Sequence, residues 1–154
     1  MKREVKLMQK VEVKIKKISP NAVLPTYGTE NAAGADLSAC LFAPITIDPG
    51  QTFVVKTGLT MEIPEGYVGL IYARSGLATK RGLAPANKVG VIDSDYRGEI
   101  MVALYNQSEL PQKIEPGERI AQLVIAPYLQ GIFNEVDELS DTTRGAGGFG
   151  STGA

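Results

Sequence analysis

The feature that most limits how this chain can fold is a series of short segments in which apolar and polar residues alternate. Turn signals that contain proline and glycine separate these segments. Three turn signals, Asp48-Pro-Gly50, Pro64-Glu-Gly66 and Glu115-Pro-Gly117, stand between such segments. Proline fixes φ and glycine accepts positive φ, so these triplets favour tight turns. Residues 11–16 show this pattern most clearly, because apolar and charged residues alternate along them. A period of two predicts strands with one buried face.

Many short strands in one chain predict an all-β domain of the sandwich, barrel or jelly-roll type. The further predicted strands cover residues 36–41, 52–57, 59–63, 67–73, 99–105, 120–126 and 132–139. One or two helical turns are predicted at Ser75–Arg81. A length of 154 residues suits one domain. We expect residues 1–10 to be a disordered extension, residues 11–140 to form the β domain, and residues 141–154 to be a mobile glycine-rich arm.

Histidine is absent from the sequence, and its absence excludes several kinds of chemistry. The chain can have no Ser-His-Asp or Cys-His nucleophile and no HExxH zinc site. The single cysteine, Cys40, can form neither an internal disulfide nor a Cys-based zinc site. A catalytic base must then be a carboxylate, a lysine or a tyrosine, and a metal ion should be a hard, oxygen-bound one such as Mg²⁺.

Charge and hydropathy limit the partners of the chain. The 16 Lys and Arg residues against 17 Asp and Glu residues give a net charge of −1, whereas nucleic-acid binders usually carry a basic excess. The sequence lacks an apolar run of the roughly 18 residues that a membrane span needs. It also has no apolar stretch behind its basic N-terminus. We therefore expect a cytoplasmic protein with no nucleic-acid or membrane partner.

The C-terminal residues Arg144–Ala154 combine glycine with an arginine, a phenylalanine and hydroxyl side chains. Gly145–Gly150 formally satisfies the GxGxxG dinucleotide pattern, and Gly145–Thr152 resembles a phosphate loop with serine in place of lysine. We expect neither a dinucleotide-binding domain nor a P-loop NTPase, because the four residues after Gly150 supply no following helix. Converging N–H groups can still bind phosphate, with Arg144 supplying charge and Phe149 a flat surface for a base. The alternative is a disordered terminus.

Two further segments could bind phosphate. Arg74-Ser75-Gly76 begins the predicted helix, where a guanidinium, a hydroxyl and free N–H groups can point at an anion. The alternative is a surface arginine beside a helix start. Gln122 is a polar residue among apolar neighbours in a predicted strand. Its amide could hold a water molecule or a phosphate, or it could simply face solvent.

The segment Asn87–Gly98 contains the strongest candidate for a base. Asp93-Ser-Asp95 resembles the start of a calcium-binding loop, but Arg97 occupies the third ligand position. Two strands with a tight connection fit better, and Asn87 and the backbone amides could then read the edge of a nucleobase. Asp93 would lie at the edge of an apolar surface, although Asp and Ser are also ordinary turn residues.

Five motifs, in order, resemble those of the deoxyuridine triphosphatase (dUTPase) family. They are Ala33-Gly-Ala-Asp36-Leu-Ser-Ala39, Arg74-Ser-Gly-Leu-Ala78, Gly90-Val-Ile-Asp-Ser-Asp-Tyr-Arg-Gly98, Gly117-Glu-Arg-Ile-Ala-Gln122 and Arg144-Gly-Ala-Gly-Gly-Phe-Gly150. The resemblance implies a jelly-roll-like β-clip barrel and a homotrimer with active sites at subunit interfaces. The C-terminal arm of one chain would close over a site built by the others.

The implied reaction is the hydrolysis of dUTP to dUMP and pyrophosphate, with Mg²⁺ held mainly by the triphosphate and water. It would lower dUTP and supply dUMP for dTMP synthesis. By the same resemblance, Asp93 holds and deprotonates the water that attacks the α-phosphorus, and Asp36 lies in the outer shell of the metal. Tyr96 packs against the deoxyribose and leaves no room for a 2′-hydroxyl. The implied substrate-binding residues are Arg74, Ser75, Gly76, Asn87, Gly90, Val91, Ile92, Tyr96, Met101, Gln122, Arg144, Phe149, Gly150, Ser151 and Thr152.

Two alternative functions for this chain differ from dUTP hydrolysis. A dCTP deaminase would share the fold and the Arg-Ser phosphate motif, but deamination in that group relies on a glutamate near the base, where this chain has Asp93. A non-catalytic dUTP-binding regulator would more naturally have lost Asp93 or a phosphate-binding arginine. The intact C-terminal motif with Phe149 also favours hydrolysis.

Overall fold

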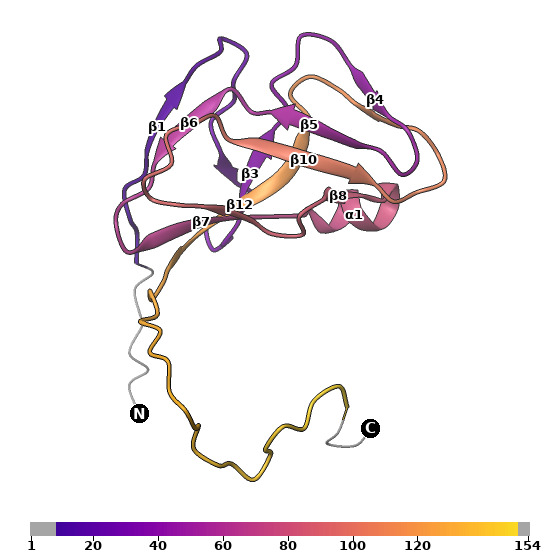
Figure 1. The fold of residues 1–154 in the computed structure, drawn as a ribbon. Helices are drawn as coiled ribbons and strands as arrows, with labels where there is room; N and C mark the ends of the chain where they lie inside the picture. The colour runs from indigo at the N-terminus through magenta and orange to yellow at the C-terminus, as the bar shows by residue number, and fades with distance from the viewer. Residues whose placement is uncertain (1–8, 151–154) are drawn as a thin grey trace, which may run out of the picture.

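The structure is a computed structural model that describes residues 9–150. Short strands and one short helix make up the regular part of these residues (Figure 1). The elements are β1 (Lys14–Lys17), β2 (Thr26–Tyr27), β3 (Ala35–Ser38), β4 (Ile45–Ile47), β5 (Thr52–Lys56), β6 (Leu59–Glu62), β7 (Tyr67–Tyr72), α1 (Ser75–Arg81), β8 (Leu83–Pro85), β9 (Gly90–Ile92), β10 (Met101–Asn106), β11 (Gln112–Ile114) and β12 (Arg119–Pro127). The all-β prediction is confirmed.

The largest sheet has the strand order β2-β3-β12-β7-β9, with antiparallel neighbours throughout. β12 lies at its centre and pairs with β3 on one side and with β7 on the other. The register sets Gln122 opposite both Asp36 and Tyr72. A β-bulge between Arg119 and Ala121 shifts the pairing of β12 with β3. This sheet therefore brings three of the predicted motif segments side by side.

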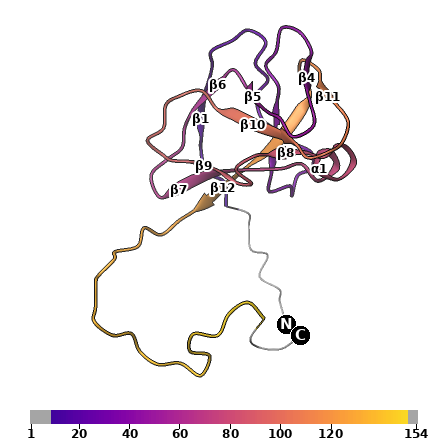
Figure 2. The same ribbon diagram turned by 45° about the vertical axis from the view of Figure 1, so that its right-hand side comes forward.

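The other sheets have the orders β5-β10-β8, β1-β6 and β4-β11. The sheets of residues 9–150 enclose a common apolar core but do not close into one continuous barrel, which gives a jelly-roll-like β-clip arrangement (Figure 2). Leu37 of β3, Leu104 of β10 and Ile120 of β12 are fully buried in this core. Burial of such side chains contributes about 1.5–3 kcal/mol each.

The helix prediction is confirmed at its stated bounds, Ser75–Arg81. Leu77 is the side chain by which α1 reaches the core, since it is 7% exposed. The helix ends at Gly82, whose φ of 65° and N–H bond to the Ala78 carbonyl form a left-handed cap. The predicted turns are confirmed as well, because Gly50, Gly66 and Gly117 all have positive φ.

Three expectations about the strands were wrong or incomplete. Residues 132–139 form no strand and are exposed along their length. No neighbouring strand of the described chain pairs with them, and an extended segment needs such a partner for its N–H and C=O groups. The two strands expected around Asp93 are present as β9 and β10, but they do not pair with each other, because β9 pairs with β7 while β10 pairs with β5 and β8. The missed strands, β2, β4, β8 and β11, have two or three residues each.

Residues 128–150 leave the sheets as an extended segment that runs away from the body of the molecule (Figure 1). The expected disordered extension at residues 1–10 lies almost wholly outside the described residues. Within the described part of the chain, no helix is long and apolar enough to cross a membrane.

Asn106, at the end of β10, is a fully buried polar residue that connects three segments of the chain. Its Nδ2 donates to the carbonyl oxygens of Ile47, at 2.9 Å, and Leu110, at 2.8 Å. Its Oδ1 accepts from the N–H and the hydroxyl of Ser108, at 2.9 and 2.7 Å. Every polar atom of this side chain is therefore satisfied without water.

We expect Asn106→Ala to lower the free energy of unfolding by about 2–4 kcal/mol, because it leaves buried carbonyl and N–H groups without partners. Urea denaturation with matched m-values measures this loss. Asn21→Ala is the control at an exposed asparagine, where the change should stay within about 0.5 kcal/mol. A loss below that value at residue 106 would show that the network is not a stabilising one.

Candidate active site

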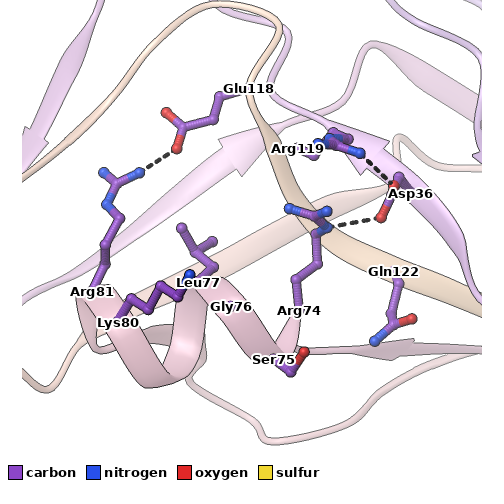
Figure 3. Close-up of a pocket in the computed structure, with 10 residues that line it drawn as sticks. All are labelled: Asp36, Arg74, Ser75, Gly76, Leu77, Lys80, Arg81, Glu118, Arg119 and Gln122. Atoms are coloured by element: carbon purple, nitrogen blue, oxygen red, sulfur yellow. Dashed lines mark hydrogen bonds and ion pairs between the residues drawn. The ribbon is translucent and has the colours of Figure 1, made fainter. Parts of the chain in front are cut away.

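A polar cleft of about 560 Å³ lies where β7 passes into α1, next to β3 and β12 (Figure 3). It contains four of the predicted phosphate-binding residues, Arg74, Ser75, Gly76 and Gln122, together with Asp36. The full lining consists of Asp36, Arg74, Ser75, Gly76, Leu77, Lys80, Arg81, Glu118, Arg119 and Gln122. We call this the cationic cleft, since its basic side chains outnumber its acidic ones.

Asp36 binds two arginines in the cationic cleft at once (Figure 3). Its Oδ1 accepts from Arg74 Nε at 2.8 Å, and its Oδ2 lies 3.3 Å from Arg119 Nη1. The Asp36 and Arg74 side chains are only 15% and 29% exposed. Because the pair engages Nε of Arg74, the terminal nitrogens of that guanidinium remain for another acceptor. The edge formed by these two terminal nitrogens is planar and suited to phosphate oxygens.

Gln122 is oriented by the backbone around it. Its Nε2 donates to the Ala73 carbonyl at 2.8 Å. A side chain at position 34 would overlap its Oε1, so glycine at that position leaves the space that the amide fills. Ser75 and Gly76 form the first turn of α1, where the N–H groups have no partner within the helix. The cleft thus offers an amide, a hydroxyl and backbone N–H groups beside its guanidinium.

A second cleft, of about 180 Å³, surrounds the end of β9. We call it the Asp93 cleft, and its lining consists of Val91, Ile92, Asp93, Tyr96, Glu99 and Met101. Asp93 is exposed and has apolar neighbours, since Val91 is 61% and Met101 42% exposed. An exposed carboxylate next to bare apolar surface can accept a proton and leaves that surface free to take up a flat, weakly polar group.

Asn87 lies in the turn that precedes β9, and Gly90 begins that strand. A Cβ atom at position 90 would lie 3.2 Å from Ile71 Cβ and 3.6 Å from Asn87 Nδ2. The close packing places the Asn87 amide against the start of the strand. The backbone of Gly90–Ile92 has one edge paired with β7. β9 is the edge strand of its sheet, so no strand among residues 9–150 pairs with its other edge.

The two clefts lie at opposite ends of β7. In the antiparallel pairing of β7 with β9, Ile71 is opposite Gly90 and Gly69 is opposite Ile92. Asp93 therefore lies beside the start of β7, while Arg74 follows its end. Six residues at about 3.3 Å each separate these positions by roughly 20 Å. One chain does not bring Asp93 and Arg74 to the same phosphate.

The described residues of the C-terminal arm that were predicted to bind substrate, Arg144, Phe149 and Gly150, line neither cleft in this chain. Phe149 is fully exposed and Arg144 is exposed, and Figure 2 shows the segment away from the sheets. Arg144 Nε donates to the Gly147 carbonyl at 2.9 Å, which closes a local turn. Gly150 is exposed too. Ser151 and Thr152 lie outside the described residues.

Sequence reasoning missed Arg119 and Glu99 as cleft residues. On a regular strand, positions 119 and 122 would face opposite sides of the sheet. The β-bulge between Arg119 and Ala121 brings both to the cationic cleft. Bulges leave no reliable trace in a single sequence. The alternation pattern predicts Glu99 as the start of a strand, whereas it lies in the loop before β10.

The donor set in the chain suits Mg²⁺ that is bound through a ligand. Among the described residues, no group of three or more His, Cys, Asp or Glu side chains could hold a metal ion. Both oxygens of Asp36 already face guanidinium groups. Mg²⁺ commonly binds substrate phosphates and keeps several waters, with few protein ligands. The residues present fit that mode, with Asp36 able to accept a hydrogen bond from a metal-bound water.

Comparison with known proteins gives consistent results. The dUTPase family profile matches residues 20–153. A deoxyuridine 5′-triphosphate nucleotidohydrolase of Desulfitobacterium hafniense is 52% identical over 149 residues, which cover 95% of this chain and 99% of the relative. The enzyme of the same name from Acinetobacter baumannii is 48% identical over 147 residues, which cover 94% and 98% of the two chains.

Solved structures of dUTPases have the same fold. A mutant dUTPase of Staphylococcus bacteriophage 80alpha, solved with dUpNHpp, superposes with a TM-score of 0.86 at 31% identity, covering 94% of this chain and all of the other. A dUTPase mutant of the S. aureus phage phi11, described with a structural Mg(II) ion, gives a TM-score of 0.73 at 27% identity, covering 83% and 98%. On the match of sequence, motifs and fold, this chain belongs to the dUTPase family and is a dUTP diphosphatase.

Proposed function

We propose that the enzyme hydrolyses dUTP to dUMP and pyrophosphate by Mg²⁺-assisted attack of water on the α-phosphorus. The reaction would lower dUTP and supply dUMP for dTMP synthesis. The observation that carries this proposal is that the two clefts differ in chemical character. One gathers guanidinium, hydroxyl and amide groups suited to phosphates, and the other places a carboxylate beside an apolar surface suited to a base.

The active unit is proposed to be a homotrimer with each site between subunits. The separation of roughly 20 Å between Asp93 and Arg74 supports this, because two chains can bring together what one chain keeps apart. Exposed apolar side chains on the β5-β10-β8 sheet also favour assembly. Among them, Phe53 is 40%, Val54 52% and Met101 42% exposed. Surfaces of this kind are commonly covered in oligomers.

In the proposed reaction, the Asp93 carboxylate accepts a proton from the attacking water. The water oxygen forms the new bond to the α-phosphorus, and the bond between that phosphorus and the oxygen bridging to the β-phosphate breaks. Pyrophosphate leaves with the electron pair. A carboxylate is an adequate base here, because phosphoryl transfer depends mainly on positioning and on neutralising charge.

The cationic cleft of a neighbouring subunit would hold the triphosphate. Arg74, kept in place by Asp36, would donate from its terminal nitrogens, and Ser75, Gly76 and Gln122 would bind phosphate oxygens and ordered water. When bound to the triphosphate, Mg²⁺ supplies further neutralisation of the charge that develops on the phosphate oxygens. These donors are fixed before substrate arrives, which lowers the cost of reorganisation.

The Asp93 cleft would read the nucleoside. Asn87 and the open edge of Gly90–Ile92 can hydrogen-bond to uracil, with Val91 and Met101 against its apolar faces. Tyr96 would lie against the deoxyribose and exclude a 2′-hydroxyl. The C-terminal arm would close over the bound nucleotide, with Phe149 over the base and Arg144, Gly150, Ser151 and Thr152 near the γ-phosphate. Closure of such an arm excludes water from the phosphates and opening releases product.

Asp93→Asn should reduce kcat by about 10²–10⁴-fold, since it removes the base and keeps the shape of the side chain. Affinity for dUpNHpp should stay close to that of the unaltered enzyme. Release of pyrophosphate and of ammonia from dUTP, dCTP, UTP and dTTP with Mg²⁺ measures both the rate and the reaction. Asp95→Asn is the matched control, an exposed carboxylate two residues away. An unchanged kcat for Asp93→Asn would remove Asp93 from the role of base, and ammonia from dCTP would identify a deaminase.

Mixing two inactive variants should restore activity. If Asp93→Asn and Arg74→Ala chains form trimers at random from equal amounts, about a quarter of the sites would be intact. Such a site combines an unaltered Asp93 from one chain with an unaltered Arg74 from another. Co-expression with two affinity tags isolates the mixed trimers, and sedimentation checks their size. Each variant alone is the control. Mixed trimers no more active than either parent would place both residues of a site on one chain.

Removal of residues 144–154 should leave the assembly and its melting temperature unchanged, because the described part of this segment, residues 144–150, lies outside the buried core. We expect kcat/KM for dUTP to fall by about 100-fold or more, as the arm's positioning of the nucleotide is lost. Sedimentation and steady-state kinetics test the two statements separately. An unaffected kcat/KM would contradict the proposed role of the arm.

A further inference from the structure

The loop between β9 and β10 is held in shape by its own hydrogen bonds. The Tyr96 N–H donates to the Asp93 carbonyl at 3.1 Å, and Arg97 Nη1 donates to the Ser94 carbonyl at 2.7 Å. At the end of the loop, Glu99 Oε1 accepts from the N–H of Gly58 at 3.0 Å. That contact attaches the loop to the turn between β5 and β6. The loop is therefore a fixed part of the Asp93 cleft.

The Tyr96 ring lies directly on the backbone of Gly98. A Cβ atom at position 98 would overlap the Tyr96 hydroxyl, and it would lie 2.5 Å from Cζ and 2.9 Å from Cε2. The same hydroxyl donates to the Glu99 carbonyl at 3.0 Å. The φ of Gly98 lies outside the left-handed region, so the backbone itself does not require glycine. What requires glycine is the position of the ring.

We propose that Gly98 is a specificity-determining position, because its missing side chain and the Glu99 carbonyl together fix the Tyr96 ring against the sugar of the nucleotide. The inference rests on the proposed function, in which Tyr96 excludes the 2′-hydroxyl. To reject a sugar with one extra hydroxyl, the side chain that contacts the sugar must stay in place. A ring that can move accepts the larger sugar at little cost. Tyr96 is 40% exposed, so solvent alone would not hold its ring in place.

Gly98→Ala tests this assignment. The methyl group must displace the ring, and we expect the ratio of kcat/KM for dUTP to that for UTP to fall at least about tenfold. The melting temperature should be little changed, because the contact lies at an exposed loop. Gly28→Ala is the matched control. It makes the same chemical change where no atom lies within 4 Å of the new Cβ, next to β2 at the opposite edge of the sheet from β9, and it should leave the ratio unchanged.

A double-mutant cycle separates an effect through Tyr96 from a general disturbance. Tyr96→Ala should lower the dUTP-to-UTP ratio by itself, and adding Gly98→Ala to it should change the ratio no further. Tyr96→Phe removes only the hydrogen bond to Glu99 and should lower the ratio severalfold. It remains a decisive variant if Gly98→Ala does not fold.

The outcomes distinguish two kinds of failure. If Tyr96→Ala loses discrimination while Gly98→Ala and Tyr96→Phe keep it, the inference about ring fixation is wrong and the proposed role of Tyr96 stands. If Tyr96→Ala keeps full discrimination, Tyr96 does not read the sugar, and both the proposed role and this inference are overturned. If Gly98→Ala lowers the ratio equally with and without Tyr96, Gly98 acts by another route and the inference is also wrong.

Discussion

The hydrogen-bonded pairing of β12 with both β3 and β7 is the constraint on which the rest of this structure depends. β12 begins beside the cationic cleft and continues through the centre of the largest sheet. Its register sets Gln122 between Asp36 and Tyr72. A slip of one residue would turn every side chain of the strand to the other face. The buried face of β12, with Ile120 fully enclosed, makes such a slip costly and so protects the register on which the cleft is built.

The charges of the cationic cleft are arranged around one carboxylate. Asp36 pairs with Arg74 and Arg119, so a positive excess remains although a carboxylate is present. Without Asp36, two guanidinium groups would face each other across partly buried surface, and each would have many more side-chain conformations available. The main effect of the Asp36 carboxylate is therefore to fix the arginine side chains, rather than to attract a ligand. It reduces the positive charge of the cleft slightly, and in exchange it fixes the direction of the one guanidinium edge left open for phosphate.

The sequence predicted the main strands, the helix and the turns because each depends on local chemistry. Alternation, proline and glycine are read directly, and Gly50, Gly66 and Gly117 have the positive φ that their turns require. Very short strands such as β4 and β11 could not be predicted, since two or three residues carry no periodicity and their partners are distant. The five motifs supplied candidate site residues, of which Arg74, Ser75 and Gln122 line the cationic cleft. They could not reveal the bulge that turns Arg119 toward the cationic cleft, nor the roughly 20 Å between Asp93 and Arg74, which depend on register.

The separation of Asp93 from the arginines has a chemical consequence in the proposed assembly. A carboxylate and a guanidinium on adjacent positions of one chain would form an ion pair as soon as the chain folds, as Asp36 and Arg74 do. A carboxylate engaged in that way is a poorer base, since its lone pairs are already used. Holding Asp93 on a different cleft, beside apolar surface and at the far end of β7, keeps its oxygens free for water. The triphosphate would then enter between the two charges, so that the arginines meet phosphate oxygens rather than the base that acts on them.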